Sequence, residues 1–347
     1  MRATVSPLNL LVLNRLGRMR LECQVFNISF FDRRMTMAEE QKYRLITRSD
    51  FDGVVCAALF RELNMIDEIK FVHPKDMQDG SILVTENDIT ANLPYVRGVH
   101  IAFDHHLSEL DRLDKAPDNL IIEAEAPSAA RVVYDYYGGK KAFPNITDDL
   151  IEAVDKGDSG QFNQDEVLDP KDWALLNFIM DSRTGLEHNK DFSISNYQLM
   201  VDFVDYCRTM DIDTILKQDD VKERVDRYFD QAEKAKEQIR RCTTVHQNFA
   251  VFDLREEETI FPANRFLIYA LYPEINISMH VLWGLNRLKI VFAVGKSVLN
   301  RTSKTNIGEF MLQYGGGGHE NAGTCQIEPS ESEEIKEELI AQITKDG

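Results

Sequence analysis

Four acidic residues and one histidine follow apolar segments of this sequence and stand beside polar or glycine-containing turns. They are Asp50, Asp52, Asp104, His105 and Asp158. A ligand set dominated by carboxylates, with only one or two imidazoles, suits Mn²⁺ or Mg²⁺ better than a structural zinc ion. Such a site can bind a phosphoryl oxygen, lower the pKa of bound water and stabilise charge on a leaving oxygen. These residues therefore indicate metal-assisted hydrolysis of a phosphoester or phosphoanhydride, with one or two ions.

The triplet Asp104-His105-His106 closes the run Val99–Phe103, whose apolar residues alternate as they do in a strand. Adjacent residues of a regular strand point to opposite faces, so both imidazoles serve one site only if the strand ends at Asp104. Ligands of open α/β sheets gather beyond the carboxyl ends of the strands, and we expect the triplet there. Taken alone, the triplet is equally consistent with an exposed turn that carries two incidental histidines.

A second acidic turn, Arg48–Gly53, lies between the strand-like run Tyr43–Thr47 and the helix-like run Val54–Leu63. Phosphate-binding loops also follow strands, but the carboxylates of Asp50 and Asp52 would repel a phosphate unless a cation lay between them. The turn therefore predicts a metal site. The alternative is that Asp50, or Ser49 before it, is an ordinary helix cap.

The elements that must position these residues alternate between strands and helices. We expect a further strand at Ser81–Thr85, a helix at Pro127–Tyr134 that stops at Gly138, and a helix around Leu150–Val154 that leads to Asp158. This order favours an α/β fold with a doubly wound, mostly parallel sheet.

The second half of the chain predicts a long connector and a smaller α/β unit. Apolar residues recur at helical spacing over Asp219–Cys242, which indicates one amphipathic helix. Strands are expected near Phe249–Phe252, Asn276–Trp283 and Arg287–Val294, with a hairpin between the last two. The final segment, Glu328–Gly347, is expected to form a solvated acidic helix.

Two segments near the end of the chain could bind an anion. The four glycines before His319 let the backbone approach a ligand closely and offer amide donors. Arg301 supplies a guanidinium that can hold a phosphate through two parallel hydrogen bonds. The alternatives are a glycine-rich surface loop and a solvated arginine.

The composition limits the class of protein. A chain of 347 residues is long enough for two domains, and its formal charge of −18 disfavours long duplex DNA and anionic membranes as partners. Its five cysteines include no Cys-x-x-Cys pair, so we expect neither a zinc knuckle nor a disulfide framework, and we expect a cytoplasmic location.

Residues 1–42 differ in character from the rest. Apolar residues of this leader precede its basic residues, the reverse of a signal peptide, and the apolar run is too short to span a bilayer. We expect translation to begin at Met37, or the leader to be disordered.

Four motifs in this order resemble the DHH phosphoesterase superfamily with its C-terminal DHHA1 domain. They are Asp50-x-Asp52-Gly53, Asp104-His105-His106, Gly157-Asp158-Ser159-Gly160 and Gly316-Gly317-Gly318-His319-x-x-Ala322-Gly323. The family includes RecJ-like exonucleases, nanoRNases, cyclic-dinucleotide phosphodiesterases and exopolyphosphatase-like proteins. The resemblance, over roughly residues 43–327, implies a DHH domain at 43–218, a connector helix at 219–242 and a DHHA1 domain at 243–347.

The resemblance also implies roles for single residues. Asp50 and Asp52 would bind separate metals, His105 would bind one of them, and Asp158 would complete the second site. The cleft between the two domains would be the place of hydrolysis.

Other residues would support the metals or hold the substrate. Asp104 would orient the cluster, and His106 would face the scissile phosphate. The residues that the resemblance implies for binding a terminal phosphate or nucleotide are Arg301, Gly316, Gly317, Gly318 and His319.

Two positions depart from the family's pattern. Arg48 stands where a histidine ligand is usual, and Asn92 is the best match to a bridging aspartate, with Asp88 as the alternative. Arginine cannot ligate a metal, and an amide lacks the charge needed to bridge two cations. In one hypothesis the protein is a hydrolase in which Arg48 stabilises the transition state directly. In the other it is a pseudoenzyme that binds nucleotide or polyphosphate and regulates or scaffolds a partner.

Retention of the remaining acids and histidines favours the hydrolase. The substrate is expected to be small and phosphorylated: a short oligonucleotide such as single-stranded RNA, pAp, a cyclic dinucleotide or polyphosphate. A homodimer is a reasonable expectation for a protein of this size.

Overall fold

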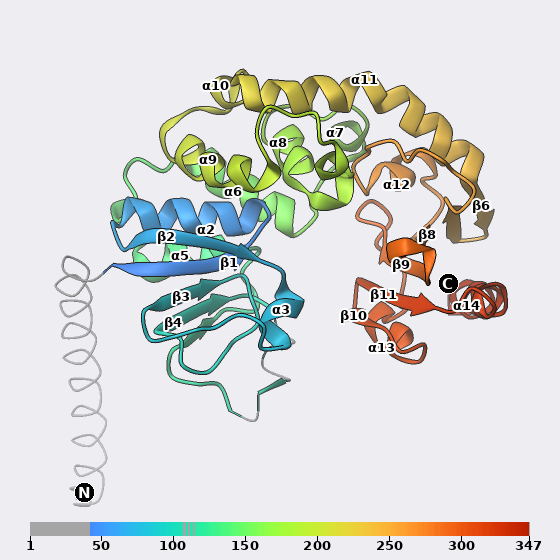
Figure 1. The fold of residues 1–347 in the computed structure, drawn as a ribbon, viewed down its shortest axis with the longest axis horizontal. Helices are drawn as coiled ribbons and strands as arrows, with labels where there is room; N and C mark the ends of the chain where they lie inside the picture. The colour runs from blue at the N-terminus through green and yellow to red at the C-terminus, as the bar shows by residue number, and fades with distance from the viewer. Residues whose placement is uncertain (1–41, 107–108, 110–111, 114, 347) are drawn as a thin grey trace, which may run out of the picture.

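A computed structural model describes residues 42–346, apart from 107–108, 110–111 and 114. Two sheets lie on either side of the molecule, and the long helix α11 (Asp219–Cys242) spans from one to the other (Figure 1). The leader predicted for residues 1–42 falls, except for Lys42, outside the described residues. Within the described part of the chain, no helix combines the length and apolar character needed to cross a bilayer.

The first sheet has five strands, and every neighbouring pair is parallel, as predicted. In sheet order they are β2 (Ile66–Val72), β1 (Tyr43–Arg48), β3 (Asp88–Ala91), β4 (Ile101–Asp104) and β5 (Leu120–Ile122). The strand order reverses between β1 and β3. In doubly wound sheets this reversal opens a crevice at the carboxyl ends of the strands, where ligands bind.

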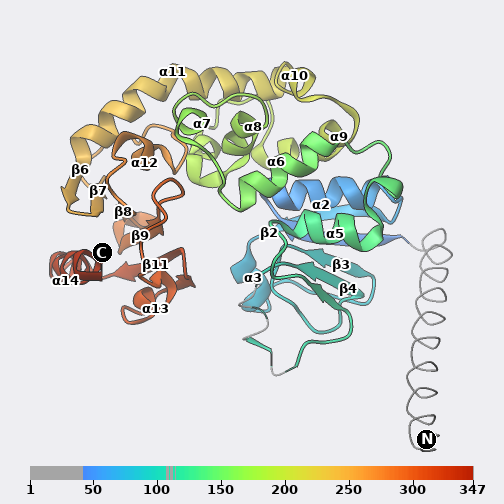
Figure 2. The same ribbon diagram turned by 180° about the vertical axis from the view of Figure 1, so that it is seen from behind.

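Helices cover one face of this sheet, where α2 (Phe51–Glu62) and α5 (Ala129–Tyr137) contact the strands directly, whereas on the other face Ile46 packs with Met77 of the five-residue helix α3 (Pro74–Gln78) and with loop residues. The other helices of this half are η1 (Gly139–Lys141), α6 (Asp148–Asp158), α7 (Gln164–Leu168), α8 (Asp172–Met180), η2 (Ser182–Thr184), η3 (Leu186–His188), α9 (Asn196–Thr209) and α10 (Ile212–Ile215). Residues 51–60 of α2 are all buried, because α5, α6 and α9 pack around it (Figure 2). The helix at Ala129–Tyr137 ends at Gly138 in the left-handed conformation, as its sequence predicts.

The strand predicted at Ser81–Thr85 is wrong. This segment forms no strand, and Leu83 is 79% exposed, while Ile82 and Val84 pack from a loop against the small apolar cluster below β1. The edge of the sheet beside β1 is occupied by β2 (Ile66–Val72), which the sequence analysis did not predict because charged residues interrupt its alternation.

The second sheet has six strands and is antiparallel except between β7 and β8. Its strands are β6 (Thr243–His246), β7 (Phe249–Asp253), β8 (Ile277–Trp283), β9 (Ile290–Lys296), β10 (Gly317–His319) and β11 (Ala322–Ile327), and its helices are α12 (Leu267–Leu271), η4 (Leu285–Arg287), α13 (Ile307–Leu312) and α14 (Ser332–Asp346). The predicted hairpin is confirmed as β8 and β9. The final helix is not merely solvated, because Leu339 and Ile343 of α14 are fully buried against the second sheet.

A shared apolar cluster joins the two halves of the molecule. Phe162 and Phe178, from the segment before α11, pack with Phe266, and Ile239 near the end of α11 belongs to the same cluster. Burial of large aromatic side chains is the main source of such cohesion. The cluster therefore fixes the second sheet relative to the site at the first.

Candidate active site

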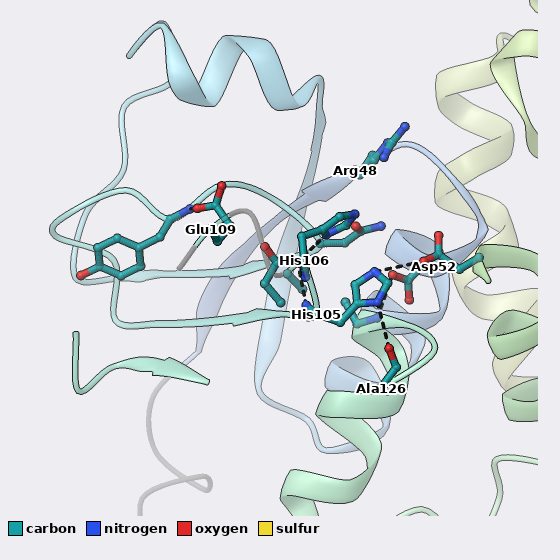
Figure 3. Close-up of polar contacts among 12 residues, drawn as sticks. Arg48, Asp52, His105, His106, Glu109 and Ala126 are labelled. Carbon is teal, nitrogen blue, oxygen red and sulfur yellow. Dashed lines mark hydrogen bonds and ion pairs between the residues drawn. The ribbon is translucent and has the colours of Figure 1, made fainter. Parts of the chain in front are cut away.

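The carboxyl ends of β1, β3 and β4 carry most of the predicted site (Figure 3). Arg48 ends β1, Asn92 follows β3, and Asp104 ends β4, which confirms that the strand stops where the two histidines begin. Asp50 is the N-cap of α2, and Asp158 is the last residue of α6. The site therefore lies at the reversal of strand order, where an open sheet binds its ligand.

Asp52 is held in the first turn of α2 and is only 2% exposed. Its two carboxylate oxygens accept hydrogen bonds from the amides of Ala129 (3.0 Å) and Ala130 (2.7 Å), at the positive end of α5. Burial, and next the charge of Asp158, raises the pKa of Asp52 to about 8. A nearby cation would therefore stabilise the ionised form of the Asp52 carboxylate, whose position is fixed by these hydrogen bonds.

Asp52, His105 and Asp158 form one group, with a possible ligand atom of each within 4.8 Å of the others. His105 Nδ1 lies 3.1 Å from the carbonyl oxygen of Ala126, and Nε2 lies 3.0 Å from an oxygen of Asp158. The carbonyl can only accept, so Nδ1 carries a proton and Nε2 faces the carboxylates. Two acceptors face each other there unless a proton or a metal ion lies between them.

The charges of this group depend on one another. Burial alone would lower the pKa of His105, but the hydrogen bond and charge of Asp158 outweigh it and raise that pKa to about 9. Burial would raise the pKa of Asp158, yet His105 keeps it below its ordinary value. Without a metal, the proton on His105 therefore balances the carboxylates.

Asp104 orients His106. The Asp104 carboxylate is 1% exposed, and its Oδ1 accepts from the backbone amide of His105 (2.8 Å) and from His106 Nδ1 (2.7 Å). Burial acts to lower the pKa of His106, but Asp104 raises it overall. The His106 ring lies 5.7 Å from the ring of His319, which brings the glycine-rich segment of the second sheet opposite the Asp-His-His triplet.

Asp50 has a different environment from Asp52. Arg48 Nε lies 2.9 Å from its Oδ2, and its Oδ1 accepts from the amide of Gly53 (3.0 Å) and from Asn92 Nδ2 (3.2 Å). Burial raises the pKa of Asp50, and Arg48 opposes that rise. Asp88, the alternative to Asn92, begins β3 at the other end of the strand, where it pairs with Arg44 at 2.7 Å.

The substrate-binding residues predicted in the second half of the chain lie beside the site, but several of them make contacts within the protein. Arg301 Nη2 donates to the carbonyl oxygens of Gly160 (2.8 Å) and Ser159 (3.3 Å), just beyond the end of α6. A Cβ on Gly316 or Gly318 would lie 2.1 or 2.3 Å from a carbonyl oxygen of β11, so the packing of β10 on β11 itself requires both glycines.

Two arginines that the sequence analysis did not single out border the site. A cavity of about 30 Å³, large enough for a water molecule or an ion, is lined by Asp50, Phe51, Asp52, Gly157, Asp158, Asn177, Asp181, Arg183 and Arg265. Arg183 Nε is 2.6 Å and Arg265 Nε 3.3 Å from the Asp181 carboxylate. Burial, followed by the charge of Arg183, lowers the pKa of Arg265 to about 10. Neither arginine lies in a sequence motif, so only the cavity that they share identifies them as residues of the candidate site.

No protein-family model matches this chain, and no curated protein does. Among solved structures, the pGpG-specific phosphodiesterase PggH from Vibrio cholerae is 56% identical, with a TM-score of 0.77 over 88% of this chain and 100% of that one. The chain belongs to the DHH/DHHA1 phosphoesterase superfamily. The DHH domain protein PF0399, described as a member of the s1p family of ribosomal proteins, is 13% identical, with a TM-score of 0.57 over 95% of this chain and 99% of that one, and shares the fold.

The identity of 56% to a phosphodiesterase, over 88% of this chain, makes the protein a hydrolase of phosphoesters. Membership in the DHH superfamily also agrees with the mixed α/β architecture, a parallel sheet followed by a second sheet. The resemblance inferred from the four motifs is thereby confirmed.

Proposed function

We propose that this chain is a divalent-cation-dependent phosphodiesterase that hydrolyses a short 5′-phosphorylated dinucleotide of the pGpG type. The observation that carries the proposal is the 56% identity to PggH over the whole of that chain. The net charge of −18 supports a small substrate, because a long nucleic acid would be repelled everywhere except at a local cationic site. Addition of one water across the phosphodiester bond of pGpG would give two molecules of GMP.

The residues at the site fit a divalent cation. Asp52, His105 and Asp158 offer two carboxylates and an imidazole nitrogen, and the Ala126 carbonyl orients that imidazole as an outer partner commonly does. A cation held there would supply a Lewis acid for a phosphoryl oxygen and would lower the pKa of adjacent water.

His106 is proposed to contact the scissile phosphate. Its Nδ1 hydrogen bonds to Asp104, so Nε2 is on the far side of the ring, and Asp104 favours the protonated imidazolium. A proton on Nε2 can be donated to a phosphoryl oxygen or to the leaving oxygen. Asp104 would then act through His106, by fixing the orientation of its ring.

Guanidinium groups are proposed to stabilise the negative charge of the substrate. Arg48 borders the site from the end of β1, and Arg183 and Arg265 reach its cavity from the other side. Arg183 and Arg265 both lie beside Asp181, and the same cavity is also lined by Asp50, Asp52 and Asp158. Their N–H groups could donate to a phosphoryl oxygen of the substrate.

The second sheet is proposed to hold the rest of the substrate. His319 lies across from His106, and a Cβ on Gly317 would meet nothing within 4 Å, so this part of β10 has open space in front of it. A terminal phosphate or a nucleoside could bind there, in front of Gly317 and beside His319.

The test is a hydrolysis assay of the full chain with Mn²⁺ or Mg²⁺ and after removal of metal with a chelator. We expect pGpG to yield GMP only with metal, faster than pAp, polyphosphate or a cyclic dinucleotide. The dinucleotide GpG, which lacks the 5′ phosphate, is the matched control for recognition of that phosphate. Cleavage of a longer RNA at an equal rate would contradict the dinucleotide preference, and metal binding without any hydrolysis would contradict the phosphodiesterase itself.

A further inference from the structure

The Asp50 carboxylate is occupied by donors from the protein. Arg48 Nε lies 2.9 Å from Oδ2, while the Gly53 amide (3.0 Å) and Asn92 Nδ2 (3.2 Å) donate to Oδ1. A carboxylate offers about four lone-pair directions, and three of them are used here. A second cation at Asp50 would need to displace these donors.

The neighbours of Asp50 also oppose a cation. The Arg48 guanidinium is a cation without a lone pair to offer and cannot ligate a metal. The amide of Asn92 is neutral, so it cannot offset the charge of two ions as a bridging carboxylate would. Accordingly, among the residues that the structure describes, Asp50 belongs to neither group of acids and histidines with clustered ligand atoms.

On the other side of the site, polar atoms remain available. Asp52, His105 and Asp158 gather their ligand atoms within 4.8 Å. Asn92 is 2% exposed, and its Oδ1 is buried without a hydrogen-bond partner, because its Nδ2 is turned to Asp50. This oxygen can accept from a cation or from water beside it.

We propose that the centre binds a single divalent cation, at Asp52, His105 and Asp158, and that the Arg48 guanidinium takes the place of a second ion on Asp50. This inference rests on the proposed cation dependence and departs from the two ions that the sequence resemblance implies. Arg48 supplies a positive charge that needs no metal, and Asn92 supplies a neutral donor to Asp50 in place of a bridging carboxylate.

The experiment counts Mn²⁺ ions per chain by native mass spectrometry and by calorimetric titration of the metal-free protein. We expect one ion on the wild type. Asp158→Asn should weaken Mn²⁺ binding by more than roughly 100-fold, beyond the loss typical of an outer-shell change, whereas Asp50→Asn should weaken it by less than about tenfold. Asparagine is also a good N-cap, so Asp50→Asn keeps the start of α2 and is a matched control for Asp158→Asn.

A gain-of-site variant tests the role of Arg48. The double variant Arg48→His, Asn92→Asp places a possible metal ligand at each of the two positions that differ from the family's pattern. We expect this variant to bind two Mn²⁺ ions, which electron paramagnetic resonance would detect as a magnetically coupled pair. One ion on a folded double variant would overturn the role given to Arg48. If that variant does not fold, the two single aspartate variants still decide where the ion sits.

The outcomes separate this inference from the proposed function. Two ions on the wild type, or loss of the single ion in Asp50→Asn, would overturn the single-ion centre while cation-dependent hydrolysis stands. A wild type that binds no ion would overturn both.

Discussion

Arg301 Nη2 donates a hydrogen bond of 2.8 Å to the carbonyl oxygen of Gly160 and so ties the second sheet to the end of α6. The same helix ends in Asp158, whose carboxylate lies 3.0 Å from His105. A side chain from one half of the molecule thus supports a proposed metal ligand in the other. Arg301 can serve as a positioning residue even before it contacts any substrate.

We therefore expect Arg301→Ala to reduce both metal affinity and substrate affinity. Loss of these partly exposed, charge-assisted hydrogen bonds should cost about 1 kcal/mol of stability. Calorimetric titration with Mn²⁺ should show weaker binding, and KM for pGpG should rise. Lys304→Ala, which removes a nearby exposed positive charge, is the matched control. Unchanged Mn²⁺ affinity in Arg301→Ala would restrict Arg301 to substrate binding.

Substitutions of the two adjacent histidines are expected to impair the enzyme in different ways. His106→Gln should lower kcat by roughly 10²- to 10⁴-fold, because it removes a proton donor, while Mn²⁺ still binds. His105→Gln should abolish Mn²⁺ binding, because it removes the imidazole nitrogen that faces Asp52 and Asp158. The measurements are metal content and single-turnover kinetics on each variant. Loss of metal from His106→Gln would show that its ring is a ligand too.

The arginines of the cavity are expected to recognise a phosphate. Arg265→Met should raise KM by about tenfold or more, the effect of losing a bidentate contact of roughly 1.5–3 kcal/mol, for pGpG and GpG alike, because its cavity is lined by the proposed metal ligands Asp52 and Asp158. Arg287→Met, at the exposed tip of the β8–β9 hairpin, is the control for loss of one positive charge. A much larger KM change for pGpG than for GpG would place the contact at the 5′ phosphate instead of the scissile phosphate.

A histidine away from the site should make a contribution to stability that is lost in mild acid, opposite in sign to the contribution of Asp52, whose pKa is raised. Burial lowers the pKa of His280 from 6.5 to about 4, where its ring meets Phe252 edge-on at 5.1 Å. At this position the unfolded chain therefore binds more protons between these two values, and the contribution of His280 to the free energy of unfolding falls as pH drops from 6.5 toward 4. The linked loss is about 3 kcal/mol at most.

Chemical denaturation of the wild type and of His280→Leu across that pH range is the measurement. The variant lacks the titrating ring, so the difference in stability between the variant and the wild type should shift in favour of the variant as pH falls from 6.5 toward 4. Parallel pH profiles for the two proteins would mean that other groups cause the acid loss.

The sequence by itself determined the parallel sheet, the tip of β4 at Asp104, the helix at Asp219–Cys242 and the β8–β9 hairpin. These features follow from local patterns: alternation in strands, helical spacing of apolar residues and turn chemistry. The order of four motifs identified the superfamily and brought most of the candidate residues to attention. Local patterns also misled, since the alternation at Ser81–Thr85 belongs to a loop whose Ile82 and Val84 pack against an apolar cluster without forming a strand.

Only the tertiary structure decided which candidates share one site and what each of them contacts. Arg265 reaches the cavity of Asp50 from more than two hundred positions along the chain, and Arg301 meets Gly160 across 141 positions. Such contacts depend on how the Phe162, Phe178 and Phe266 cluster packs the two halves together. The pairing of Arg48 with Asp50, and the separation of Asp88 from both, likewise depend on which end of a strand each residue occupies. A sequence gives residue types and spacing, but charges act over distances of a few ångströms, and those distances are set by packing.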